Sequence, residues 1–218
     1  MGYLVLKDLL LQKKMLLLAF LYVFMFTFAF QGMGEAQLVT IISAVGYTFV
    51  MLGGAWEEKN TSDVLWNSLA VPKWKIVGAK YLAIPVYVAI VILVYGIVSP
   101  FMSLLRVPVR AMPLDLVGAV LGMVAVFIAA SVYYPVYFAL GYAKSRYWHF
   151  IVFFGVMISA SMLPTLFPNK PEWIDPLFER LPELARGEAV PAALGVVFVI
   201  LVGVSFFASL RLYGRREF

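Results

Sequence analysis

The chain has 218 residues, of which 63% are hydrophobic and only 13% are charged. Soluble domains average about 45–50% apolar and about 25% charged residues, so a soluble protein of this length could not cover so much apolar surface. The composition excludes a soluble globular class, and the absence of cysteine excludes disulfides and thiolate metal sites.

Long apolar runs fill most of the chain, and they set its predicted architecture. A helix needs about 18–25 apolar residues to cross about 30 Å of hydrocarbon. The runs do not alternate every second residue, which favours helices over a barrel. We predict an all-α, polytopic membrane protein with one domain, 1–218. Its six transmembrane helices are expected at residues 15–30, 36–54, 81–105, 114–141, 150–167 and 189–210.

Residues 1–14 precede the first predicted span and differ from it in composition. Lys7, Asp8 and Gln12 lie among leucines in this segment. Such a mixture suits a helix that lies on the membrane surface with its charges in water. We therefore predict an N-terminal interfacial helix.

The loop between the second and third spans, residues 55–80, contains the pattern of a short helix. Residues 60–62 (Asn, Thr, Ser) can cap a helix, and Asp63 would stand near its positive end. The pattern ends at Leu69, before Pro72 prevents continuation. A helix this short is not stable alone in water, so packing must hold it. It could fit a partner's groove, or it could be an ordinary amphipathic connector.

The later part of the chain offers two local patterns. Gly118-x-x-x-Gly122 in the fourth span predicts close helix packing, either within the chain or at a dimer seam. In the segment 168–188, Asp175-Pro176 starts a helix pattern that Gly187 ends. This pattern predicts an external helical segment, which could equally be a plain amphipathic surface helix.

The distribution of Lys and Arg predicts the orientation of the spans. Twelve of the 17 basic residues fall on the side that holds both termini and the loop 55–80. Cytoplasmic loops carry such an excess. We therefore expect both termini in the cytoplasm, and we interpret the net charge of +5 as topological bias rather than as nucleic-acid binding.

The sequence contains no motif of a catalytic or metal site. The single histidine, His149, excludes a His-Glu-x-x-His metal site, and neither a Gly-x-Ser-x-Gly elbow nor a Walker-type phosphate loop occurs. The predicted spans hold no ionisable residue near their centres, since Asp115 and His149 fall at span ends. This argues against proton or sodium coupling within the chain. We predict no catalytic and no metal-binding residues.

Two groups of polar residues could line a path for cargo. Tyr133, Tyr134 and Tyr137 cluster toward the inner end of the fourth span, and Ser159 and Ser161 lie in the fifth. They would suit amphipathic or lipid-like cargo. Aromatic belts and hydrogen bonds between helices explain the same residues equally well.

The loop also carries the most specific sequence pattern in the chain. It reads Glu57-x-Lys59-Asn60-x-x-Asp63-Val64-Leu65-x-Asn67-Ser68-Leu69-x-Val71-Pro72, then Lys75-Ile76-Val77-x-Ala79-Lys80-Tyr81. Together with the opening Leu9 to Lys14 and the six-span layout, it resembles the ABC-2-type transporter permease family. Within that family it is most similar to small six-span permeases of phenol-soluble modulin and antimicrobial peptide exporters.

The resemblance implies partners for the chain. Such permeases pair as dimers, of identical or different chains, and each half binds a cytoplasmic ABC ATPase made as a separate chain. ATP and Mg²⁺ would be bound by that ATPase, and this chain would hold no cofactor. The helix in the loop 55–80 would be the cytoplasmic coupling helix. The coupling residues on this template are Glu57, Glu58, Asp63, Leu65, Asn67 and Ser68.

We therefore expect a multi-pass protein of the cell (inner) membrane that is the permease subunit of an ABC exporter and not itself an enzyme. Its cargo would be amphipathic peptides or other hydrophobic molecules, and its surroundings the lipid bilayer rather than nucleic acid. Two alternatives are open. One is a non-transport protein, an immunity factor or a sensor, that binds a cytoplasmic partner through residues 57–72. The other is a carrier or channel that works without ATP.

Overall fold

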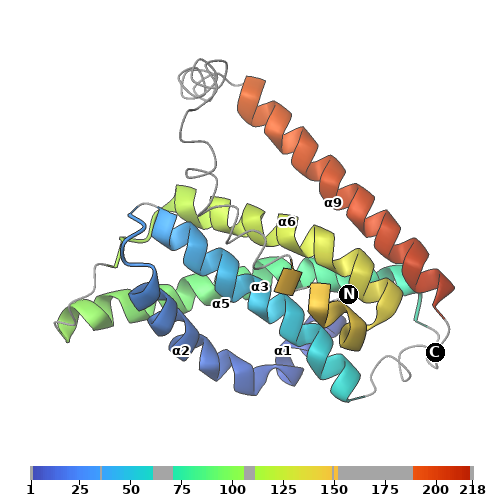
Figure 1. Cartoon of the computed structure of the whole chain (residues 1–218), viewed down its shortest axis with the longest axis horizontal. Coiled ribbons are helices and arrows are strands. Elements are labelled where there is room, and N and C mark those ends of the chain that lie inside the picture. The colour runs from blue at the N-terminus through green and yellow to red at the C-terminus, as the bar shows by residue number, and fades with distance from the viewer. Residues whose placement is uncertain are drawn as a thin grey trace.

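The computed structural model describes residues 2–34, 36–60, 71–105, 111–148, 150–151 and 189–216. Within these ranges every regular element is helical, which confirms the predicted all-α class (Figure 1). The helices are α1 (Gly2–Leu11), α2 (Lys13–Ala29), α3 (Ala36–Lys59), α5 (Lys73–Leu104), α6 (Leu116–Leu140) and α9 (Ala189–Arg215).

Four of the described helices are long and apolar enough to cross a membrane. They are α3, α5, α6 and the Ala192–Arg215 part of α9, and they correspond to four of the predicted spans. The apolar part of α2, Leu17–Ala29, is shorter. Of the predicted fifth span only residues 150–151 are described, and the predicted external segment 168–188 lies outside the described residues.

Two helices extend beyond the spans predicted for them. Helix α3 continues to Lys59 rather than ending near residue 54, and α5 begins at Lys73 rather than residue 81. Apolar runs mark only the part of a helix that faces lipid or an apolar core. The polar turns after the apolar run of α3 and before that of α5 are stabilised by the ion pairs described below, and composition does not reveal those pairs.

Helix α3 occupies the centre of the bundle, with α2, α5 and α6 packed around it (Figure 1). In its most apolar stretch 61% of the residues are buried, against 11% in α9. Two glycines let α6 approach it: an added Cβ would lie 3.0 Å from Leu38 Cδ2 at Gly118 and 2.7 Å from Ile42 Cβ at Gly122. The glycine motif therefore packs within the chain.

Buried hydroxyl groups connect α9 to the rest of the bundle. The Tyr81 hydroxyl on α5 lies 2.7 Å from Ser205 Oγ and 3.2 Å from Ser209 Oγ on α9. Ser205 in turn donates to the backbone oxygen of Ser131 on α6, at 2.6 Å. These contacts hold the C-terminal half of α9, whereas its N-terminal half diverges from α6 (Figure 1).

Several helix termini meet at one end of the bundle, at the right in Figure 1. Lys73 Nζ at the start of α5 donates to the Gly214 carbonyl oxygen at the end of α9, at 3.2 Å. Glu58 near the end of α3 accepts from the Ala143 N–H just after α6, at 2.9 Å. The segment that joins α3 to α5 therefore starts and finishes among the ends of α6 and α9.

Candidate functional site

Four charged side chains from three helices form a closed ring at this end, which we call the ion ring. Its members are Lys7 and Asp8 of α1, Glu57 of α3 and Lys80 of α5. Lys80 Nζ lies 2.8 Å from Glu57 Oε2 and 3.1 Å from Asp8 Oδ2. Lys7 Nζ lies 2.9 Å from Asp8 Oδ1 and also pairs with Glu57 Oε1. Each cation thus contacts both anions.

The ion ring is buried, which makes its charge balance important. Asp8, Glu57 and Lys80 are 2%, 3% and 4% exposed, and the Lys7 side chain is 20% exposed. Transfer of a lone charge from water into such surroundings is very costly, so these charges can persist only as partners. A cavity lined by all four residues measures about 10 Å³, at the lower limit for one water molecule.

Neighbouring polar groups complete the surroundings of the ion ring. The Tyr137 hydroxyl on α6 donates to Glu57 Oε2 at 2.9 Å. Gln12, between α1 and α2, hydrogen-bonds the Tyr87 hydroxyl on α5 at 2.8 Å. Lys80 and Tyr87 are two helical turns apart and so face the same side of α5. The ring is therefore linked to α6 through Tyr137, in addition to the three helices that supply its members.

A glycine pair on α3 provides the space for these side chains. A Cβ at Gly53 would come 2.9 Å from Gln12 Nε2, and a Cβ at Gly54 would come 2.8 Å from Tyr137 Cε2. Gly53 lies one turn before Glu57, on the same face of the helix. The small residues thus allow α1 and α6 to approach α3 where the ion ring forms.

The position of the ion ring suggests what it can do. Glu57 lies two residues before the end of α3, and Lys80 lies two turns after the start of α5. Both ends of the connection between α3 and α5 are thereby bound to α1. A relative displacement of α1, α3 and α5 at this end would separate buried opposite charges.

Comparison with models of protein families shows which family the chain belongs to. The model described as ABC-2 family transporter protein matches residues 3–214. The chain belongs to this family. No curated protein and no solved structure matches it. The ABC-2 chain is thus a membrane component of a transporter, as its sequence pattern predicted.

The structure of this ABC-2 protein describes two of the six predicted coupling residues. Glu57 is a buried member of the ion ring rather than a surface group, whereas Glu58 is exposed and binds the Ala143 N–H. Asp63, Leu65, Asn67 and Ser68 lie outside the described residues. The role of all six toward an ATPase remains a prediction, and Glu57 could serve it only by positioning its neighbours.

The candidate cargo residues of the ABC-2 protein are likewise partly described. Tyr133, Tyr134 and Tyr137 are 1–3% exposed and contact one another through their rings. Tyr134 donates to the Lys80 carbonyl oxygen at 3.1 Å. In this conformation the three tyrosines belong to the packed interior, and their place on a cargo path remains a prediction. Ser159 and Ser161 lie outside the described residues.

Sequence reasoning missed the ion ring as a unit. It interpreted Lys7 and Asp8 as polar residues of a surface helix and Lys80 as part of the pattern that follows the loop. One signal was available: Gly53-Gly54 lies one turn before two glutamates at the end of an apolar run. That pattern indicates a close contact. The residues that contact Glu57 are far from it in the sequence: Lys7 lies 50 positions before it, Lys80 lies 23 positions after it, and Tyr137 lies 80 positions after it. A single sequence does not reveal such pairs.

Proposed function

We propose that this ABC-2 protein is the permease subunit of an ABC exporter, driven by ATP hydrolysis in a separate cytoplasmic ATPase. The supporting observation is the ion ring at the base of the connection between α3 and α5, in a chain of the ABC-2 family. The predicted coupling helix lies within that connection. A partner that moves it would act on a buried, charge-paired junction rather than on a loose loop.

The ion ring would make this junction stiff. Withdrawal of one charged side chain from the ring leaves a buried charge uncompensated, at a cost of about 3–5 kcal/mol. ATP-driven movement of the coupling helix would therefore shift α1, α3 and α5 as one body. Because Tyr137 binds Glu57, the same movement would reach α6 and its tyrosine cluster.

The remaining features of the proposal concern the assembly. The assembly would contain two permease chains, identical or different, each with six spans and cytoplasmic termini. In this arrangement the basic end of the bundle would face the ATPase. The cargo would be amphipathic peptides or other hydrophobic molecules. Its path would include Tyr133, Tyr134 and Tyr137, together with Ser159 and Ser161, after rearrangement of the helices.

Tagged purification from the native membrane tests the proposal. We expect a soluble ATPase to co-purify with the intact chain and to be lost from the double variant Asp63→Ala/Leu65→Asp. The matched control applies the same two kinds of change in the predicted external segment, Asp175→Ala/Leu177→Asp. The control should retain the ATPase and its ATP hydrolysis.

Two results would contradict the proposal. If the intact chain retains no ATPase under mild detergent, the exporter has no energy source, and the immunity or sensor alternative becomes the better one. If both double variants lose the ATPase equally, the loop has no special role in binding it.

A further inference from the structure

A second group of charges near the same end of the bundle differs from the ion ring because it is exposed. After α6 the chain turns at Gly141, whose φ of +78° favours glycine, and forms a short helix at residues 142–148. Lys144 and Arg146 of this helix are exposed, and so are Arg211 and Arg215 of α9. The Arg216 guanidinium packs over Gly141, 2.8 Å from the position of an added Cβ, and so brings the two elements together.

The salt bridges of the described residues lie elsewhere, in the ion ring. Every salt bridge in the described part of the chain involves Lys7 or Lys80, and none includes these four residues. Glu58 accepts a hydrogen bond from the Ala143 N–H at the start of the short helix, and its negative charge also acts on Arg146. Among the described residues, these four cations therefore outnumber the one carboxylate that acts on them, and the surface is positive there.

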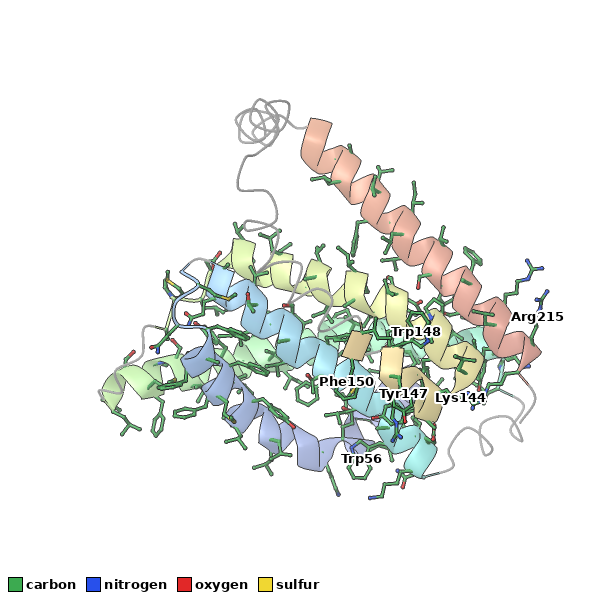
Figure 2. The ribbon with its side chains drawn as sticks, in the orientation of Figure 1. Trp56, Lys144, Tyr147, Trp148, Phe150 and Arg215 are labelled. Carbon is green, nitrogen blue, oxygen red and sulfur yellow. The ribbon has the colours of Figure 1, made fainter. Side chains whose placement is uncertain are left out.

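Large aromatic side chains accompany the charges. Tyr147 and Trp148 are 60% and 48% exposed, and Phe150 and Ile151 just beyond them are 53% and 61% exposed. Figure 2 shows Lys144, Tyr147 and Trp148 near the end of the bundle where Arg215 lies. Arg146 stacks on the Tyr147 ring, 5.0 Å from its centre, which keeps both side chains outside the core.

We propose that this surface binds the headgroups of anionic phospholipids. Trp and Tyr prefer the headgroup level of a bilayer, and Lys and Arg at that level attract anionic lipids. Phe150 and Ile151 would enter the acyl boundary, while Lys144, Arg146, Arg211 and Arg215 contact phosphate groups. A soluble ATPase fits less well, because it would leave exposed apolar side chains beside charged ones.

The test compares lipids retained by the full-length protein. The chain is reconstituted in vesicles of phosphatidylcholine with about one third phosphatidylglycerol, re-extracted gently, and its bound lipids are quantified by mass spectrometry. We expect enrichment of phosphatidylglycerol, and a roughly thirtyfold lower apparent affinity for it in Lys144→Gln/Arg146→Gln. The control Lys59→Gln/Lys75→Gln removes the same charge from the same end outside this surface and should keep the enrichment.

Further variants separate a lost site from a lost fold. The exchange Lys144→Arg/Arg146→Lys keeps the charge and should keep the enrichment, whereas Arg211→Gln/Arg215→Gln should reduce it. Equal loss in the control and test variants would mean diffuse attraction and would overturn the proposal. So would unchanged lipids with a lost ATPase in Lys144→Gln/Arg146→Gln, because the surface would then bind the protein partner.

Discussion

Glu57 touches more buried polar groups than any other acid in the described part of the chain: Lys7, Lys80 and the Tyr137 hydroxyl. The variant Glu57→Gln leaves two cations with only Asp8 between them. We expect a loss of about 3–5 kcal/mol in unfolding free energy, because one buried positive charge is then uncompensated. Thermal unfolding of the protein in lipid nanodiscs measures this. Glu58→Gln, at an exposed site, should change stability by about 0.5 kcal/mol or less.

Exchange of charges tests the pairing itself. In Glu57→Lys/Lys80→Glu the ion ring keeps two cations and two anions, but the exchange also brings like charges together beside Lys7 and beside Asp8. The double variant should therefore be less stable than the native chain and, because its net charge is restored, more stable than either single variant. A coupling free energy of about 1–3 kcal/mol is expected from the double-mutant cycle. Additive losses would show that the two side chains act independently and that the ring is not a unit.

At the scale of single elements, the contact between α3 and α6 depends on glycine. Gly122→Ala would place a Cβ 2.7 Å from Ile42 Cβ, in a position where neither backbone can yield without a shift of the helix. We expect destabilisation of about 1–3 kcal/mol, measured by thermal unfolding in nanodiscs. The control is Gly96→Ala on α5, where nothing lies within 4 Å of the added Cβ. It should be neutral or stabilise by up to about 1 kcal/mol.

The sequence could predict the elements that consist mainly of apolar residues. The runs at 36–54, 81–105, 114–141 and 189–210 all correspond to long helices, because burial in lipid or in the core demands the same composition over the whole run. Helix ends were less predictable. Lys80 and Glu57 lie inside helices because each neutralises the other across two helices, and no local pattern in either segment records that pairing.

At the scale of the whole molecule, the meeting of helix termini makes the topology testable. The chain contains no cysteine, so single cysteines can serve as reporters without prior removal of others. Lys59→Cys and Lys144→Cys lie at the basic end, and Leu114→Cys lies just before α6, at the opposite end. In intact cells a membrane-impermeant maleimide should label only Leu114→Cys. Labelling of all three would mean that the described helices do not separate two sides of a membrane.

The ion ring has one electrical consequence. Transfer of one elementary charge through a membrane potential of 100 mV involves about 2.3 kcal/mol. The ring contains two positive and two negative groups whose ion pairs are 3.1 Å or shorter, so its displacement as a body carries no net charge. Movement of this junction would then do no work against the membrane voltage, and a depolarised cell would operate it as readily as an energised one.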